Sequence, residues 1–289
     1  MSFAYRYIKE KQIQWANNQG KQLTGSEGER GDPAYTQKLE DNLLDPLLES
    51  VKDKFDKGNG NEINDHPPHQ AKMKAVHSSS ALCVNVFQYW EMKHQVPMIT
   101  AACRFCRKGT TVSKRISFEE KYDIPGVTGA PPNIDVVIYN SGKPQFEVFA
   151  IESKFSEAYA DRGKKDLEPA YLQVDALWED IPNLHDFARS ISPVNTSNKH
   201  LDSAQLVRHI LGLKSDCGKD GFKLLYLWYD ALGEAGAKHR DEIDAFARIA
   251  QADGINFSSL TYQELIVWLA RECREEHSEY VKYVTERYL

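Results

Sequence analysis

The chain has 289 residues, of which 41% are hydrophobic and 27% are charged, and its formal net charge at pH 7 is −6. This composition is typical of an ordinary globular protein with a sizeable core, and it argues mildly against a basic protein that coats nucleic acid. It does not exclude a nuclease. Carboxylates that hold a divalent cation lower the net charge, while a local basic surface can still follow a phosphate backbone.

The apolar segments are shorter than the roughly 18 consecutive apolar residues that a membrane helix needs. The opening sequence MSFAYRYIKEKQIQW lacks the apolar run of a secretory signal. Five cysteines at irregular spacing do not make a disulfide framework, which indicates free thiols in a reducing compartment. We therefore expect a cytoplasmic protein that has no membrane partner.

The first quarter of the chain is polar and is interrupted by loops. A short leading helix precedes the loop GSEGERGDP, and the segment TQKLEDNLLDPLLESVKDKF then has leucines at helical spacing. Pro46 can start or kink this second helix. The stretch KGNGNEINDHPPH predicts another loop. We therefore expect residues 1–75 to form an N-terminal extension of helices and loops.

Helices and strands alternate after this extension. The serines of SSSALCVNVFQYWEMKH can cap a buried helix that begins near Ser78, and a strand is the competing interpretation. The segments MITAACRFC and VSKRISFEEKY are typical of short strands. The segment PPNIDVVIYNSGKPQFEVFAIESKF predicts two apolar strands, joined by the turn-forming residues 140–143 into a hairpin.

The second half of the chain continues this alternation. LEPAYLQVDALWEDI, DSAQLVRHILGLKS and DEIDAFARIAQ have helical patterns, whereas KLLYLWYDA and INFSSL are typical of strands. Thr261 and Glu264 have the spacing of a capping box ahead of another helix. The charged residues 271–289 predict an amphipathic C-terminal helix. An α/β fold, with helices flanking a central mixed sheet, buries all these faces together.

A Glu-x-Lys triplet occurs three times in the chain, and the context separates the three. Those that begin at Glu91 and Glu119 lie at an apparent helix end and in a polar stretch, where a solvated face explains the charges. The triplet Glu152-Ser153-Lys154 instead closes an apolar run of strand length. Because two charged residues should not end a buried strand without a partner, this triplet is the candidate for chemistry.

Strand alternation predicts how these side chains meet. Alternate residues share a face of a strand, so Glu152 and Lys154 point the same way, and Asp135 shares a face with Val137 in the preceding strand. A hairpin register that matches the apolar faces then brings Asp135 beside Glu152 and Lys154. Two carboxylates this close need a proton, a cation or an ammonium group to be tolerated.

A divalent metal together with Lys154 supplies that charge. Hard oxygen ligands suit Mg²⁺, which usually takes one or two protein carboxylates and completes its shell with water and substrate phosphate. Such a site hydrolyses phosphodiesters, and a lysine beside it can orient water or stabilise developing charge. The alternative without chemistry is a buried ion pair between Glu152 and either Lys154 or Asp135.

The order of Asp135, a hairpin, the triplet ESK and a helix resembles the core of the PD-(D/E)XK, restriction-endonuclease-like nucleases. More narrowly, the patches HSSSA from His77, AIESKF, and TYQE from Thr261 resemble a family of bacterial restriction endonucleases whose activity is uncharacterised. These patches lie between about residues 77 and 269. Ile134 stands where the motif often has proline, a position that is tolerant in this superfamily.

The resemblance implies a Mg²⁺-dependent endonuclease that acts on DNA, with Mn²⁺ as a possible substitute. It implies Asp135 and Glu152 as metal ligands, the backbone carbonyl of Ser153 as another, and Lys154 as catalytic base or stabiliser. It also implies one nuclease domain over the whole of residues 1–289. The core of that domain is at residues 76–270, between the N-terminal extension and the C-terminal helix.

Three further residues are candidates for the site. Glu120, on the strand that leads toward Asp135, matches the extra acidic residue that many such cores add, and an exposed strand charge is the alternative. Gln173 resembles the glutamine that some relatives place near the metal, and a surface glutamine is the alternative. His77 could contact a phosphate, although a histidine at a helix start is more often a capping or core group.

Two other functions stay open beside DNA cleavage. The first is a binding or scaffold protein that has kept the nuclease fold without activity, and the intact Asp135, Glu152 and Lys154 argue against it. The second is a nuclease that acts on RNA or on a structured repair intermediate, because loops and surface shape decide the substrate. DNA is thus the expected partner, and the sequence leaves open whether the protein is a homodimer.

Overall fold

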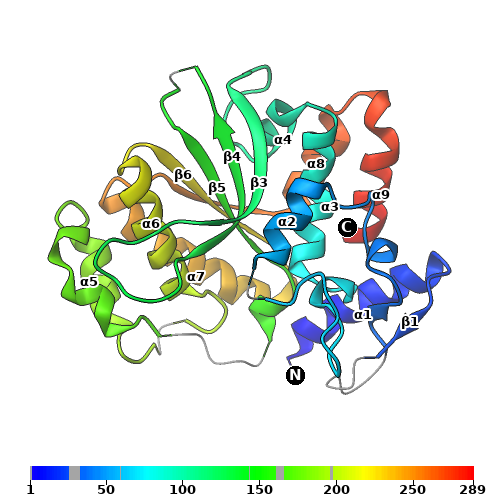
Figure 1. Cartoon of the computed structure of the whole chain (residues 1–289), viewed down its shortest axis with the longest axis horizontal. Coiled ribbons are helices and arrows are strands. Elements are labelled where there is room, and N and C mark those ends of the chain that lie inside the picture. The colour runs from blue at the N-terminus through cyan, green and yellow to red at the C-terminus, as the bar shows by residue number, and fades with distance from the viewer. Residues whose placement is uncertain (1, 26–32, 59, 143, 161–165, 196–197) are drawn as a thin grey trace.

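A five-stranded sheet lies between two layers of helices in the computed structural model of the chain (Figure 1). This is the α/β architecture that the alternating segments predict. No helix in the part of the chain that the structure describes is both long and apolar enough to cross a membrane. The structure describes residues 2–25, 33–58, 60–142, 144–160, 166–195 and 198–289.

The sheet has the strand order β3-β4-β5-β6-β7 and is mixed. The pairs β3–β4 and β4–β5 are antiparallel, whereas β5–β6 and β6–β7 are parallel. The strands β4 and β5 therefore form the predicted hairpin. The strands are β3 (Ser113–Lys121), β4 (Asn133–Asn140), β5 (Val148–Lys154), β6 (Phe222–Trp228) and β7 (Phe257–Thr261), with a separate pair β1 (Leu23–Thr24) and β2 (Tyr35–Thr36).

Helices cover both faces of this sheet (Figure 1). One layer contains α5 (Pro182–Ser190), α6 (Ser203–Cys217) and α7 (Gly233–Ala252). The other contains α1 (Phe3–Asn18), α2 (Glu49–Asp56), α3 (Ser79–Met92), α4 (Val96–Ala102), α8 (Tyr262–Glu272) and α9 (Ser278–Tyr288). Strand β5 packs against both layers of helices. Val148 and Ala150 lie on the α6 side, and Phe149 and Ile151 lie on the α3 side.

Both predicted helix caps are present. Ser78 precedes α3, and its hydroxyl accepts a hydrogen bond from the Ala81 amide at 3.2 Å. Thr261 precedes α8 and forms a reciprocal capping box with Glu264. Each cap satisfies backbone amides that the first turn of a helix leaves without partners.

The leucine-rich segment at residues 36–55 is helical only in part, which corrects the expectation of one helix. It forms a 3₁₀ turn at Leu39–Asn42 and then extended backbone, and α2 begins only at Glu49. Pro46 disfavours helical backbone for the residue before it and cannot donate a hydrogen bond itself. The Leu44 amide donates instead to the side chain of Asn85 in α3, at 2.7 Å.

Two other segments differ from their predicted form. MITAACRFC, expected as a strand, lies largely in α4, whose first turn contains a proline. Short apolar runs of this kind fit a buried helix or a buried strand equally well. LEPAYLQVDALWEDI, expected as a helix, forms two 3₁₀ turns at Pro169–Gln173 and Asp175–Leu177. Val174 separates them with a φ of −109° and a ψ of 84°.

Arg287 of α9 joins the two ends of the chain. This side chain is fully buried, and its guanidinium donates to the carbonyl oxygens of Asn42 and Val76 at 2.8 and 3.2 Å. It also donates to Gln12 of α1 at 3.2 Å and lies 4.1 Å from the centre of the Trp15 ring. The network therefore fixes α1 and α9 against the segment that leads into α3.

Candidate active site

Three carboxylates lie at one level of the sheet, on three neighbouring strands. The β4–β5 ladder ends one position before Asp135 of β4 would pair with Glu152 of β5. In the β3–β4 ladder, the register passes over the position at which Glu119 would pair with Asp135. The strands thus bring Glu119, Asp135 and Glu152 side by side where regular pairing breaks down.

Glu119, expected from the sequence to be a solvated charge, is instead largely shielded from solvent. Its φ is +53°, in the left-handed region that residues with a Cβ rarely adopt. Its carboxylate accepts a hydrogen bond from the Asn133 side chain. Burial, and then the charges of Asp135 and Glu62, raise the pKa of Glu119 to about 8.

Asp135 is half-buried and is held by the backbone of the next strand. Its Oδ2 atom accepts a hydrogen bond from the Ser153 amide at 2.7 Å. Burial, and then the neighbouring Glu152 carboxylate, raise the pKa of Asp135 well above its ordinary value, although the charge of Lys154 opposes the shift. A carboxyl group in this position takes up a proton unless a cation lies beside it.

Glu152 is fully buried, and its two oxygens differ in their surroundings. Oε1 accepts a hydrogen bond from the Lys154 ammonium. Oε2 accepts no hydrogen bond from the described residues and lies 3.3 Å from Nδ1 of His209. Burial raises the pKa of Glu152 to about 7, against the opposing effect of Lys154.

Lys154 keeps its positive charge in this site. Burial alone would lower its pKa, but the carboxylates of Glu152 and Asp135 outweigh burial and raise the pKa well above the ordinary lysine value. The ammonium also donates to Oε1 of Gln205 at 2.9 Å. Lys154 is therefore a fixed cation between a carboxylate and an amide oxygen.

Gln205 and His209 come from α6, and the sequence analysis missed both. They are four residues apart and hence on one face of the helix. The helix approaches the sheet closely at Gly212, where a Cβ would lie 2.9 Å from Cβ of Tyr122. Burial, and then the Lys154 charge, lower the pKa of His209 to about 3, so its imidazole is neutral. Their spacing of four residues, on one face of a helix that follows the Glu-x-Lys triplet, was the available signal.

Glu120 does not take the place expected for the extra acidic residue. Its carboxylate pairs with Lys54 of α2 at 2.9 Å and accepts a hydrogen bond from Ser117. Burial would raise the pKa of Glu120, but these two partners outweigh it and lower the pKa. The β3–β4 register pairs Phe118 with Val136 and Glu120 with Ile134, so Glu119 and not Glu120 lies opposite Asp135.

The structure also places Gln173 and His77 outside the immediate site. Gln173 is exposed at the end of a 3₁₀ turn, because its segment does not continue as a helix, and Gln205 is the glutamine beside Lys154. His77 is buried just before the cap of α3, and its Nε2 atom lies 3.0 Å from the Tyr5 hydroxyl. It lines a neighbouring cavity together with Glu157.

The donors at this site fit a hard cation such as Mg²⁺. No three His, Cys, Asp or Glu side chains among the described residues form a ready-made metal site. Mg²⁺ needs only one or two protein carboxylates, however, and Asp135 and Glu152, level with each other on neighbouring strands, supply such oxygens. Ser153 directs its amide toward Asp135, and its carbonyl lies on the same edge of the strand as its amide.

Comparison with known proteins gives one match. A family model described as restriction endonuclease associating with ARP matches residues 9–289. No curated protein and no solved structure matches the chain. The matched range includes the whole sheet and every residue of the candidate site.

Proposed function

The chain belongs to the family of restriction endonucleases associating with ARP, and from this premise we propose that it is a metal-dependent nuclease that hydrolyses phosphodiester bonds in DNA. The observation that carries the proposal is the fully buried Glu152 carboxylate. One of its oxygens accepts a hydrogen bond from Lys154, and the other accepts none from the described residues and lies 3.3 Å from Nδ1 of His209. Asp135 lies level with Glu152 on the next strand. A buried carboxylate with an oxygen that accepts no hydrogen bond destabilises the folded protein unless a cation or a proton neutralises it.

Asp135 and Glu152 would hold Mg²⁺ or Mn²⁺, with the Ser153 carbonyl as a further oxygen donor. When bound, the metal would polarise the phosphoryl oxygen and lower the pKa of a coordinated water. Glu119 is the additional acidic residue of the site, in the place expected for Glu120. Burial and neighbouring carboxylates raise the pKa of Glu119 and of Asp135, and a bound cation would lower both pKa values.

Lys154 is the catalytic base or the stabiliser of developing negative charge. Without a metal, burial would lower its pKa but the Glu152 and Asp135 carboxylates raise it well above its ordinary value, which favours the stabiliser. A fixed ammonium of this kind stabilises the charge that develops on a phosphoryl group. Gln205 holds the ammonium in position by accepting one of its protons in a hydrogen bond.

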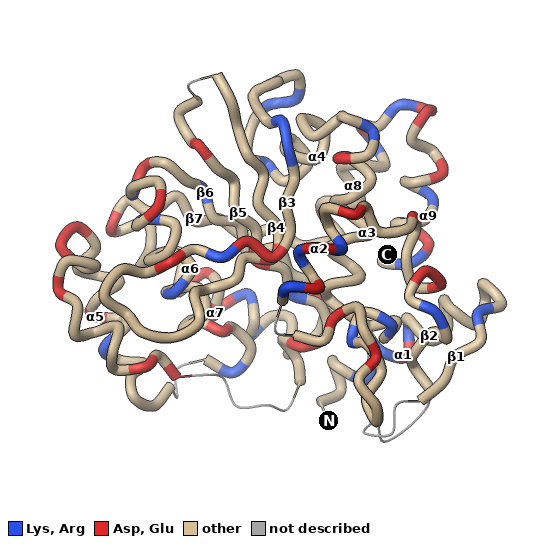
Figure 2. The backbone as a smooth tube through the Cα atoms, in the orientation of Figure 1, with Lys and Arg blue, Asp and Glu red and all other residues tan. Residues whose placement is uncertain are grey.

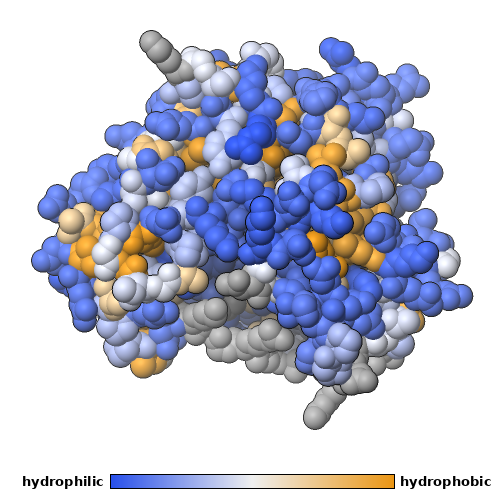
Figure 3. Space-filling model, in the orientation of Figure 1, coloured by the Kyte–Doolittle hydropathy of each residue, from blue (hydrophilic) through white to orange (hydrophobic). Residues whose placement is uncertain are grey.

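A DNA substrate is supported by the family and by the surface beside the site. Figure 2 shows Lys and Arg on β3 and α2, close to the acidic end of β3. Figure 3 shows that this part of the surface is hydrophilic. Basic side chains that follow one edge of a sheet can track a phosphate backbone. The exposed ones here are Lys52, Lys57, Lys114, Arg115 and Lys121. The five free thiols favour a cytoplasmic location.

A cleavage assay tests this proposal. Purified protein would be incubated with Mg²⁺, Mn²⁺ or a chelator, together with plasmid, linear duplex, single-stranded DNA and RNA. We expect metal-dependent cleavage of DNA, which Asp135→Asn abolishes and Glu120→Gln leaves intact, because Glu120 pairs with Lys54 outside the site. In calorimetric titrations, Mn²⁺ should bind Asp135→Asn more weakly than it binds wild type, and should bind Glu120→Gln as it binds wild type. Absence of both cleavage and metal binding in the wild-type protein would refute the proposal.

A further inference from the structure

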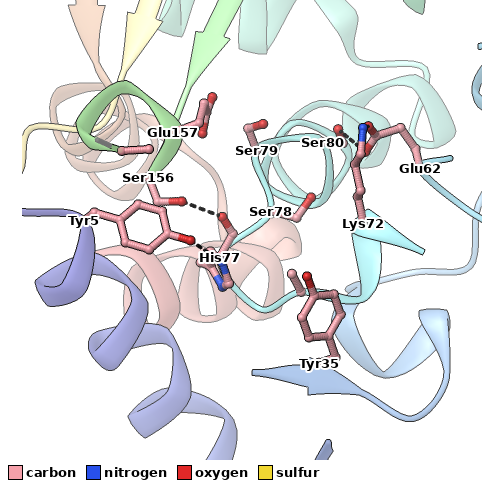
Figure 4. Close-up of a pocket in the computed structure, with 12 residues that line it drawn as sticks. Tyr5, Tyr35, Glu62, Lys72, His77, Ser78, Ser79, Ser80, Ser156 and Glu157 are labelled. Atoms are coloured by element: carbon pink, nitrogen blue, oxygen red, sulfur yellow. Dashed lines mark hydrogen bonds and ion pairs between the residues drawn. The ribbon is translucent and has the colours of Figure 1, made fainter. Parts of the chain in front are cut away.

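A cavity of about 470 Å³ lies beside the first turn of α3 (Figure 4). Its walls come from α1, β2, the first turn of α3 and the 3₁₀ turn Glu157–Tyr159 that follows β5. This volume is within the range of about 300–1,000 Å³ that small-molecule sites occupy. The residues that decide its chemistry are Tyr5, Tyr35, Glu62, Lys72, Ser80 and Glu157.

The cavity adjoins the candidate active site where the chain leaves β5. Glu157 lies three residues beyond Lys154, and its carboxylate accepts hydrogen bonds from the Phe155 amide at 3.2 Å. A nucleotide whose phosphate lies at the carboxylates would therefore have the cavity within reach of its sugar and base.

The charges that line the cavity disfavour a phosphate group. Two carboxylates, those of Glu62 and Glu157, line the cavity. The Lys72 ammonium is already paired with Glu62 at 3.5 Å, and the Ser80 hydroxyl donates to the same carboxylate at 2.9 Å. Like charges repel, whereas a neutral group with N–H or O–H donors would find acceptors here.

Two aromatic rings make the cavity suitable for a nucleobase. Tyr5 and Tyr35 reach it from α1 and β2 (Figure 4). Tyrosine rings are surfaces on which unstacked bases lie in nucleic-acid complexes, and carboxylates accept hydrogen bonds from exocyclic amino groups. The Tyr5 hydroxyl lies 3.0 Å from Nε2 of His77, so a change of Tyr5 would also disturb His77, and Tyr35 is the ring to change in a test.

We propose that this cavity is a nucleoside subsite, which takes the base of an unpaired nucleotide next to the bond that is cut. A base can enter a cavity of this kind only after it leaves the helical stack. The inference rests on the proposed nuclease function and narrows its substrate class. The preferred substrate is nucleic acid with an unpaired nucleotide at the site of cleavage, over continuous duplex.

Binding without a metal tests the inference independently of cleavage. The probes are three fluorescent DNA duplexes in EDTA: one with a single-nucleotide bulge, one with an abasic bulge and one that is continuous. Wild-type protein should bind the bulged duplex roughly fivefold or more tightly than the other two, since base stacking on one aromatic side chain is worth at least that factor. Equal affinity for the bulge and the abasic bulge would overturn the inference.

Variants locate the effect in the cavity. Tyr35→Ala should bind all three duplexes equally. This variant lacks the ring on which the bulged base stacks, so the presence of the base no longer adds to the affinity. Tyr35→Phe and Tyr7→Ala should keep the preference, since Tyr7 lines a different cavity. A preference that persists undiminished in a folded Tyr35→Ala protein would place the base elsewhere. If Tyr35→Ala does not fold, the comparison of bulge and abasic bulge on wild-type protein decides alone.

The same samples separate this inference from the proposed function. Cleavage with Mg²⁺, but without any preference for the bulged duplex, would refute the nucleoside subsite and support the proposed nuclease function. Base-dependent binding without cleavage in Mg²⁺ or Mn²⁺ would support the subsite and contradict the nuclease.

Discussion

Nδ1 of His209 lies 3.3 Å from Oε2 of Glu152, and both atoms are shielded from solvent. The imidazole also hydrogen-bonds to the Asn133 backbone, which fixes the ring between β4 and β5. A neutral ring held in this way limits how the Glu152 carboxylate can turn. A residue that contacts a metal ligand and orients it affects metal affinity almost as strongly as the ligand itself does.

The variant His209→Asn should therefore weaken the site without removing any proposed ligand. We expect metal affinity or cleavage rate to fall by roughly 10- to 100-fold, the usual cost of losing such a contact. Calorimetric Mn²⁺ titration and a cleavage assay measure the two quantities. His277→Asn is the matched control, because His277 is also buried but contacts Tyr89 away from the site. Wild-type affinity and wild-type rate in His209→Asn would show that the contact has no role.

Glu119 should make the metal-free protein less stable as the pH rises. Its pKa is about 8 in the folded protein and 4.5 for an ordinary glutamate, so the folded state holds its proton over a wider range than the unfolded state. Stability from this group is complete below about pH 4.5 and is lost as the pH rises through 8. In chelator, the melting temperature of Glu119→Gln relative to wild type should rise across that interval and then level off.

Glu120→Gln is the control for the Glu119 prediction, because the pKa of Glu120 is shifted the other way. Its contribution to stability is present above the ordinary glutamate pKa and is lost as the pH falls through the lowered value. Relative to wild type, Glu120→Gln should therefore gain nothing as the pH rises to 8. Parallel pH profiles for the two variants would contradict the assignment of Glu119 to the carboxylate cluster.

The capping box at α8 should contribute measurably to stability. The Thr261 hydroxyl accepts from the Glu264 amide at 3.1 Å, and the Glu264 carboxylate accepts from the Thr261 amide at 3.0 Å. Thr261→Ala should lower the free energy of unfolding by about 1 kcal/mol, as measured by urea denaturation. Ser259→Ala, an exposed change on β7, should alter it by less than about 0.5 kcal/mol. Equal stability of the two variants would show that the cap contributes nothing.

The central part of the site followed from local sequence rules. The alternation of apolar residues predicts the β4–β5 hairpin, whose register places Asp135 level with Glu152. The predicted turn at residues 140–143 lies partly outside the described residues, and β5 begins only at Val148. The caps at Ser78 and Thr261 were also predictable, because a capping side chain acts on its own first turn. These features depend on residues close together in the chain.

The rest of the site depends on features that no local pattern encodes. Glu119 takes the place expected for Glu120 because of the β3–β4 register, which is set by how two strands pair and not by the residue type. Gln205 and His209 reach the site through the packing of α6, more than fifty residues beyond Glu152. Helical periodicity in residues 167–181 predicts that Gln173 lies on a helix near the metal, but this segment forms only 3₁₀ turns.

Separating metal binding from catalysis tests the central claim most directly. Calorimetric titration with Mg²⁺ or Mn²⁺ would be run beside a DNA cleavage assay on wild type, Lys154→Ala and Glu152→Ala. Lys154→Ala should bind metal nearly as wild type does and lose roughly 10²- to 10³-fold in cleavage rate, because only the stabiliser of developing charge is removed. Glu152→Ala should lose metal affinity first. If Lys154→Ala cleaves DNA at the wild-type rate, the proposed chemistry is wrong.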